Sequence, residues 1–222
     1  MNYTSLVSAI QAYAENTESL FVSNIPLFIQ QSELRIYNSV QIPVLRKNVT
    51  GTVTSSNPYL SCPDDFMAVY SLAAISAAGA YNYLIDKDVS FVREAYPNPT
   101  VTGLPKYYAI FGTQLTYPTE LSLILTPTPD ANYSVELHYY YMPESITVAV
   151  SGTTWLSDNY DPVLFYGAMR EAMIFMKGEA DMVGYYEQKY QEALGQLKRL
   201  GDGLERGDSY RNNQTKLPYS SL

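Results

Sequence analysis

The spacing of apolar residues changes twice along this chain of 222 residues, and this change most limits the folds that it can adopt. Near both ends, apolar side chains recur every three or four positions, which is typical of amphipathic helices. Between Val44 and Val150 they recur every second position, and Gly, Pro and Asn separate runs rich in Val, Ile, Thr and Tyr. These patterns predict an α+β protein in which a β region interrupts a set of helices.

Four helices are predicted, two before the β region and two after it, at residues 4–16, 24–40, 161–177 and 181–201. The second begins at the capping residue Asn24, has Pro26 in its first turn and counts Leu34 among its apolar residues. The third is apolar around most of its circumference, with Phe175 near its end, so it is predicted to be the centre of a helical bundle. Gly201 is predicted to end the fourth helix.

Strands are predicted at residues 45–53, 66–76, 81–94, 105–111, 121–125 and 133–141. The last two flank the turn-forming segment 127–130, so they are predicted to pair as an antiparallel hairpin. Strands of this number and spacing favour a sandwich or barrel. The predicted organisation is a discontinuous helical bundle of residues 1–43 and 155–201, an inserted antiparallel β domain of residues 44–154 and an extended C-terminal arm of residues 202–222.

Composition adds information about the surface. Charged residues make up 16% of the chain, below the ~25% of an ordinary soluble domain, and tyrosine occurs 22 times. Tyrosine is enriched in protein interfaces because it offers a large contact area at a low cost in entropy. This composition is therefore typical of a subunit whose surface is covered by neighbours. A tyrosine-rich β core explains it equally well, and composition alone does not separate the two.

Net charge and hydropathy restrict the kinds of partner that this chain can bind, and its cysteine content indicates the compartment in which it is made. The formal net charge is −8, whereas a protein that binds nucleic acid by neutralising phosphates needs an excess of basic residues. No apolar run approaches the ~20 residues that span a bilayer, so no membrane partner is expected. Cys62 is the only cysteine, which excludes an internal disulfide and is expected of a protein made in a reducing compartment such as the cytoplasm.

The sequence contains no recognisable catalytic or cofactor-binding motif. His138 is the only histidine, which excludes a two-histidine metal site, and it is predicted to lie on the polar face of a strand. Cys62 is predicted to be a small structural residue. Asp86 and Asp88 are predicted to share one exposed strand face rather than to bind a cation. We therefore expect no catalytic residue, no cofactor and no metal.

Four segments together resemble the head-to-tail adaptor (connector) proteins of tailed bacteriophages, including the tail tubular protein A type. They are YLIDKDVSFVREAYPNPTVTGLPKYYAIF, LILTPTPDANYSVELHYYYMPESIT, TTWLSDN and MREAMIFMKGEADMVGYYEQKYQEAL. The resemblance covers about residues 60–197 and implies a helical bundle with an inserted β domain. It also implies a virion protein at the head-tail junction, in a ring of twelve subunits under the portal. Its implied partners are its own copies, the portal, tail or nozzle proteins, and DNA that passes through the channel without sequence-specific binding.

The end of the chain is the predicted portal-docking element, because in relatives the C-terminal segment extends to the portal. Apolar anchors are expected at Leu204, Tyr210, Leu217 and Tyr219, and basic partners for acidic portal groups at Arg206, Arg211 and Lys216. A loose chain end without a role is the alternative reading of the same segment.

Two other functions stay open at this point. A virion-associated cell-wall hydrolase needs two carboxylates roughly 5–10 Å apart in a cleft. The candidates for it are Glu94, Glu136, Glu171 and Glu179, which lie on different predicted elements. A carbohydrate-binding β module, the second alternative, uses tyrosines as stacking platforms but has no need of the flanking apolar helices.

Overall fold

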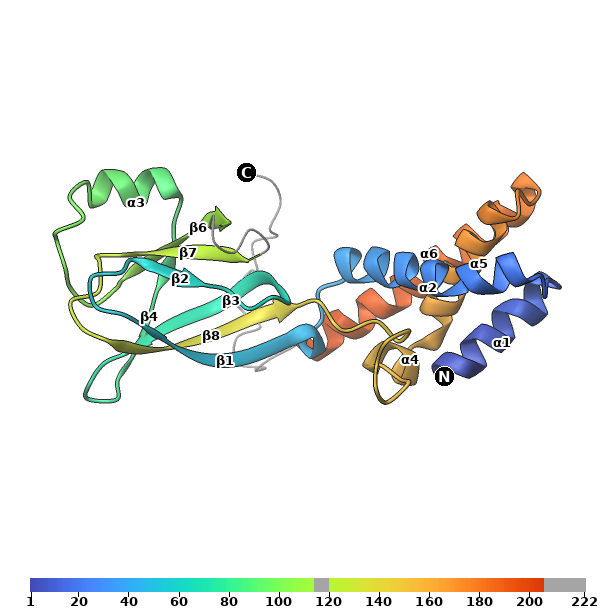
Figure 1. Ribbon diagram of the computed structural model, residues 1–222, viewed down its shortest axis with the longest axis horizontal. Helices are drawn as coiled ribbons and strands as arrows, with labels where there is room; N and C mark the ends of the chain where they lie inside the picture. Colours follow the sequence, from blue (N-terminus) through green and yellow to red (C-terminus); the bar gives the residue numbers. More distant parts are fainter. Residues whose placement is uncertain (114–119, 206–222) are drawn as a thin grey trace. The chain divides into compact units, whose positions relative to one another are not determined.

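Apart from one short helix, helices and strands occupy different parts of the chain, as predicted for an α+β protein. The computed structural model describes residues 1–113 and 120–205, which form six α-helices and two sheets (Figure 1). The chain divides into two compact units. The helical unit contains Met1–Val44 and the described residues from Pro143 onward, and the β unit is Leu45–Met142.

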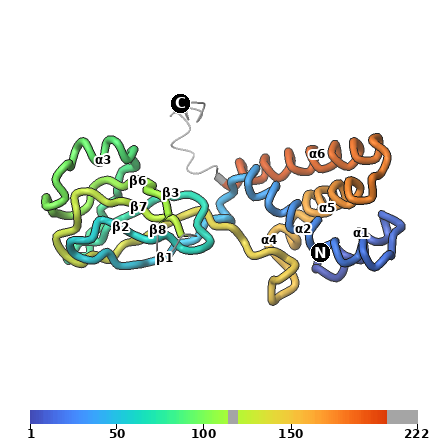
Figure 2. Tube along the Cα trace, turned by 45° about the horizontal axis from the view of Figure 1, so that its top comes forward, coloured from blue at the N-terminus to red at the C-terminus, as the bar shows by residue number. Residues whose placement is uncertain are grey.

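The helical unit is built around one central helix. Its helices are α1 (Tyr3–Ala14), α2 (Ser19–Ser39), α4 (Trp155–Asn159), α5 (Asp161–Phe175) and α6 (Ala180–Glu205). α5 packs against each of the other four, and Figure 2 shows it among them. Five of its side chains are almost completely buried, namely Val163, Leu164, Ala168, Met169 and Ala172. These contacts confirm the prediction that the third of the four predicted helices is central.

α2 begins five residues before the predicted start, so Pro26 lies in its interior rather than in its first turn. The early start is stabilised by Phe21 and Ile25, which are both buried. The ring of Phe21 packs against those of Phe28 and Phe175. Burial of these side chains outweighs the loss of the one backbone hydrogen bond that proline cannot make. Phe175 itself is 39% exposed, so it is not the fully buried core residue that its helix suggested.

α6 continues to Glu205, so the prediction that Gly201 ends this helix is wrong. Gly201 is buried, and a Cβ atom at this position lies 2.5 Å from Cγ2 of Ile42. Glycine is needed here because α6 closely approaches the segment that follows α2, not because the backbone turns. Gly167 on α5 has the same role, since a Cβ atom there lies 2.0 Å from Oγ of Ser32 on α2.

The β unit consists of two four-stranded sheets around one hydrophobic core, so it is a sandwich and not a barrel. The first sheet has the order β1-β8-β3-β4 and the second the order β2-β7-β6-β5. The strands are β1 (Arg46–Val53), β2 (Tyr59–Ser61), β3 (Phe66–Ile75), β4 (Tyr81–Tyr83), β5 (Ile85–Asp86), β6 (Tyr107–Thr113), β7 (Leu121–Thr126) and β8 (Tyr133–Tyr141). β5 pairs with β6 in parallel, and the other strand pairs are antiparallel. In the core, Leu72 and Leu137 of the first sheet join Leu123 and Leu125 of the second.

β7 and β8 do not form the predicted hairpin, because they lie in the middle of different sheets. β8 pairs with β1 and β3, while β7 pairs with β2 and β6. The segment between them is held by other contacts, since Gly103 N–H donates to the carbonyl of Thr128 and Ser56 N–H to that of Pro129. An arch between two sheets and a hairpin within one sheet use the same alternation and turn residues, so the sequence did not separate them.

The predicted strand 81–94 is wrong in its second half, which forms α3 (Val89–Ala95). The carboxylate of Asp88 accepts a hydrogen bond from Ser90 N–H and so caps this helix. Val92 is buried with Ala109 and Ile124, which anchors the helix on the second sheet. Asp88 is therefore a helix cap, whereas Asp86 ends β5, and the two do not share a strand face.

Candidate functional site

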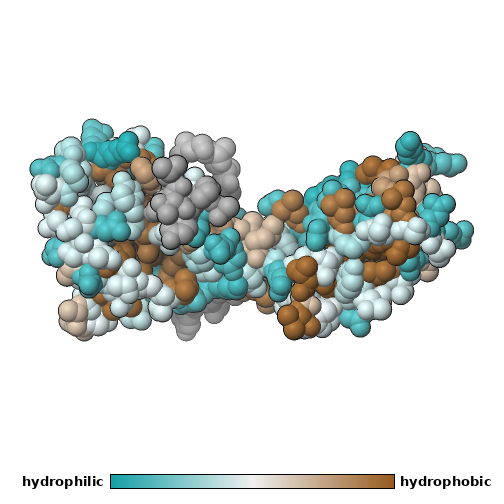
Figure 3. Space-filling view, in the orientation of Figure 1, coloured by the Kyte–Doolittle hydropathy of each residue, from teal (hydrophilic) through white to brown (hydrophobic). Residues whose placement is uncertain are grey.

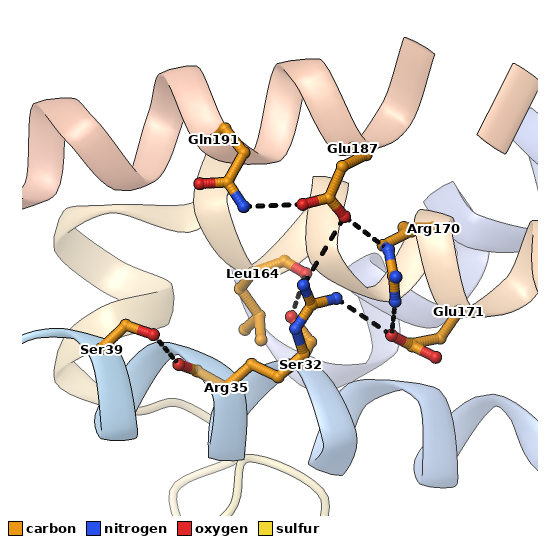
Figure 4. A network of polar contacts seen from close by, with 8 residues as sticks. All are labelled: Ser32, Arg35, Ser39, Leu164, Arg170, Glu171, Glu187 and Gln191. Atoms are coloured by element: carbon orange, nitrogen blue, oxygen red, sulfur yellow. Dashed lines mark hydrogen bonds and ion pairs between the residues drawn. The ribbon is translucent and has the colours of Figure 1, made fainter. Parts of the chain in front are cut away.

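A network of charged side chains joins three helices of the helical unit (Figure 4). Arg35 of α2 lies with Nη1 3.3 Å from Glu171 Oε1 of α5 and with Nη2 3.6 Å from Glu187 Oε2 of α6. Arg170 of α5 contacts the same two carboxylates. Gln191 Nε2 donates to Glu187 Oε1 at 2.6 Å. The network therefore ties α2, α5 and α6 to one another.

The Glu187 carboxylate is unsuited to acid catalysis. Burial by itself raises the pKa of Glu187, but the hydrogen bond from Gln191 and the charges of Arg170 and Arg35 outweigh it and hold this pKa below its ordinary value. The general acid of a glycosidase needs a raised pKa. Glu171, one of the hydrolase candidates, is held by two guanidinium groups. The ion pairs of this network hold α2, α5 and α6 together.

Glu33 of α2 is more deeply buried than the carboxyl groups of the network, with only 3% of its surface exposed. Its Oε1 accepts a hydrogen bond of 2.9 Å from Ile146 N–H, which fixes the segment between β8 and α4 to α2. Burial raises the pKa of Glu33, and the hydrogen bonds from Ile146 and Ser145 offset only part of this effect. Among the described residues, Glu33 Oε2 has no hydrogen-bond partner.

Glu33→Gln is expected to become more stable relative to the wild type as the pH rises. Because burial raises the pKa of Glu33 above 4.5, its stabilising contribution is complete below pH 4.5 and is lost as the pH rises through the raised value. Glutamine keeps an acceptor for Ile146 N–H and carries no charge. Urea unfolding at several pH values measures the difference, with Glu192→Gln on the exposed face of α6 as the control. A stability of Glu33→Gln relative to the wild type that falls, or stays constant, as the pH rises contradicts the prediction.

The structure does not bring the other candidate catalytic residues together. Within residues 1–113 and 120–205, no three His, Cys, Asp or Glu side chains are grouped so that they can hold a metal ion. Cys62 is buried, and burial raises the pKa of its thiol to about 12, so it is not a thiolate at neutral pH. Glu94 lies on α3, Glu136 on β8 and Glu179 just before α6.

Aromatic and cationic side chains from neighbouring strands contact one another across the first sheet. The guanidinium carbon of Arg46 lies 4.0 Å from the ring centroid of Tyr70 and 5.0 Å from that of Tyr140. His138 packs edge to face on Tyr70, with 4.9 Å between the centroids. Arg46 thus covers one face of the Tyr70 ring, the kind of surface on which a sugar stacks, and its Nη2 donates a hydrogen bond of 2.7 Å to the Tyr140 hydroxyl. This arrangement does not favour the carbohydrate-binding alternative.

α2 exposes a face that carries no charge. Leu20, Leu27 and Leu34 are spaced by seven residues, which places them on one side of the helix, and they are 65%, 48% and 48% exposed. We call these three residues the leucine ridge. The other exposed residues of α2 are Ser19, Ser23, Gln30, Gln31, Asn38 and Ser39. Apolar patches are visible on the surface of the helical unit in Figure 3.

The outer face of α6 has a different composition. Its exposed residues include the charged Asp181, Glu192, Lys198, Arg199 and Asp202, together with the apolar or aromatic Met182, Tyr185, Leu200 and Leu204. Charged residues of both signs are typical of a helix face in contact with water. Charged residues are depleted at the centre of protein interfaces, so the uncharged exposed face of α2 fits the centre of an interface better than the charged one of α6.

An aromatic groove of about 220 Å³ lies between α1 and the first turns of α5. We define it by five of its lining residues, Ala9 and Tyr13 of α1 and Pro162, Phe165 and Tyr166 of α5. Tyr13 is 64% exposed, and its ring packs edge to face on Phe165 with 5.0 Å between the centroids. The groove therefore offers aromatic surface to a partner.

A comparison with known protein families identifies the chain. The SU10 adaptor protein family matches residues 1–216. The chain belongs to this family. It is a structural adaptor of bacteriophages, which confirms the resemblance to phage head-to-tail adaptors that the sequence indicated. No curated protein matches the chain.

Most of the predicted portal-docking residues of this adaptor lie outside the described residues, namely Arg206, Tyr210, Arg211, Lys216, Leu217 and Tyr219. Leu204, the remaining one, lies in the last turn of α6 and is 51% exposed. Their role stays a prediction. In the part of the adaptor that the structure describes, no helix has both the length and the hydropathy to cross a membrane.

Sequence reasoning missed both exposed apolar surfaces of the adaptor. For the leucine ridge a signal was present, since three leucines recur every seventh residue in a helix whose only charged members are Glu33 and Arg35. For the aromatic groove the sequence held no signal, because Tyr13 and Phe165 lie far apart along the chain and meet only through the packing of α1 on α5.

Proposed function

We propose that this chain is a head-to-tail adaptor whose copies, twelve in number, form a ring under the portal and provide the platform on which tail or nozzle proteins dock. The observation that carries this proposal is the match of the SU10 adaptor protein family to residues 1–216. The low content of charged residues, the 22 tyrosines and the uncharged face of α2 support it. Subunits in a closed ring bury two side surfaces, and such surfaces are poor in charge.

In the proposed adaptor, residues 1–43 and 155–201 form the helical bundle, residues 44–154 form the inserted β domain, and an arm follows at the C-terminus. The division of the chain into a helical unit and a β unit supports this organisation, with residues 143–154 counted in the helical unit rather than in the β domain. Because α6 continues to Glu205, the arm begins after that residue and not at residue 202.

The ring also extends the DNA channel in this proposal. A subunit with a formal net charge of −8 repels phosphate groups, so DNA passes the wall without being held and without any reading of its sequence. Electron microscopy of purified portal rings mixed with the full chain tests the proposal. A continuous ring of added density on one end of the portal is the expected result, and intact portal rings without added density contradict it.

The C-terminal arm is the proposed portal-docking element. Removal of residues 206–222 is expected to leave the urea unfolding curve nearly unchanged, because the described core residues of the helical unit all precede them. The same removal is expected to abolish co-sedimentation with portal rings, since the proposed anchors are lost. Both measurements use the full-length chain as the reference.

Two full-length variants separate the kinds of contact in the arm. The first replaces the apolar anchors Tyr210, Leu217 and Tyr219 with serine, and the second replaces the basic residues Arg206, Arg211 and Lys216 with serine. The first is expected to weaken binding at every salt concentration, and the second to weaken it mainly at low salt. If the truncated chain binds portal rings at wild-type strength, the docking role belongs to another part of the adaptor.

A further inference from the structure

The leucine ridge and the aromatic groove lie on opposite sides of the helical unit. The side of α5 that carries Leu164 meets α2, because the carbonyl oxygen of Leu164 accepts a hydrogen bond of 3.3 Å from Ser32 Oγ. Each residue turns an α-helix by about 100°. Pro162 and Tyr166 are both two positions from Leu164, so they point about 160° away from it, to the side remote from α2. The leucine ridge is on the surface of α2 that faces away from α5.

We infer that the leucine ridge of one subunit packs into the aromatic groove of the next subunit, and that this contact joins neighbouring copies of the chain in the ring. The inference rests on the proposed function and names the surfaces that make the ring. It assigns the ridge and the groove to one another, because one is a convex apolar row and the other a concave aromatic surface. The partner of each surface is thus a second copy of this chain.

The position of the two surfaces fits a ring. A cyclic assembly needs two different patches on each subunit, so that every copy offers one patch to the neighbour on either side. The leucine ridge and the aromatic groove lie on opposite sides of the helical unit, so each subunit can contact one neighbour through the ridge and the other through the groove. A self-complementary patch, in contrast, joins two copies and then stops.

Charge also favours a second copy as the occupant. Two copies of a chain with net charge −8 repel one another, so they associate best through a face without acidic groups. The exposed residues of α2 include none. The acidic residue at the groove is Asp161, and the ridge brings Ser, Asn and Gln side chains to it rather than a second carboxylate. The outer face of α6 exposes Asp181, Glu192 and Asp202, so it is not free of acidic groups.

Cysteine crosslinking tests the contact in the full chain assembled on portal rings. Leu27→Cys is placed in the ridge and Tyr13→Cys at the groove, both at exposed positions, while the natural Cys62 is buried. A short bis-maleimide reagent is expected to convert the double variant into a ladder of covalent multimers on a denaturing gel. Each single variant is expected to stay monomeric on the same gel. Leu27→Cys combined with Gln188→Cys, on the outer face of α6, is the matched control pair and is expected to give no ladder.

Each of the other outcomes contradicts the inference. Rings that form on the portal while the double variant gives no ladder show that other surfaces join the subunits, and the proposed function then stands without this contact. Dimers from Leu27→Cys alone show that two ridges pack on each other. A ladder from the control pair assigns the contact to α6. If the wild-type chain forms no oligomer, with or without portal rings, the inference and the proposed function both fail.

Discussion

Ile29→Ala is expected to lower the free energy of unfolding by about 2–5 kcal/mol, because it opens a cavity in the core of the helical unit. The side chain of Ile29 is fully buried on the α5-facing side of α2. Leu27→Ala, only two positions away on the same helix, is expected to cost about 1 kcal/mol or less, since Leu27 is 48% exposed. Urea unfolding of both variants, followed by circular dichroism, measures the two changes.

This pair of variants tests which face of α2 is core and which is surface. A cost for Leu27→Ala equal to that for Ile29→Ala contradicts the orientation of the helix. If Leu27→Ala changes the free energy of unfolding only slightly, substitutions at this position are also suitable for assembly experiments. Loss of ring formation in such a variant then reports on the contact between subunits and not on folding.

Gly167→Ala is the second substitution with a large expected effect, a loss of about 1–3 kcal/mol from overpacking. The added Cβ atom lies 2.0 Å from Ser32 Oγ, 3.1 Å from Ser32 Cβ and 3.2 Å from the ring of Tyr190. A different rotamer of Ser32 relieves only the first of these contacts, so α2 and α5 must also move apart. Combining Gly167→Ala with Ser32→Ala is expected to recover part of the loss.

Gly195→Ala provides the matched control for Gly167→Ala. Gly195 lies inside α6, and a Cβ atom there meets nothing within 4 Å. Alanine is favoured over glycine inside a helix by roughly 0.5–1 kcal/mol, so this variant is expected to be more stable than the wild type. Opposite signs for the two glycines in urea unfolding support the close approach of α2 and α5. A stabilising Gly167→Ala contradicts it.

Local patterns were sufficient to predict the types of the long elements and the central position of α5. A helix that is apolar around its whole circumference can only be stable when other helices surround it, and α5 is surrounded. The alternation in residues 133–141 predicted β8 within its observed bounds. Family membership was also indicated by the sequence, because four of its segments resemble phage head-to-tail adaptors and the family model matches residues 1–216.

Only the tertiary structure decided which elements meet. The turn between β7 and β8 fits a hairpin and an arch equally well, and partners from distant segments assigned the two strands to different sheets. Gly201 lies inside α6 where the helix closely approaches Ile42, and no local rule anticipates this contact. Leu34 has the spacing of a core residue but faces outward, because α5 and α6 cover the other side of α2. Spacing along the chain sets which residues share a face, whereas packing between distant segments sets which face is buried and which is left for a partner.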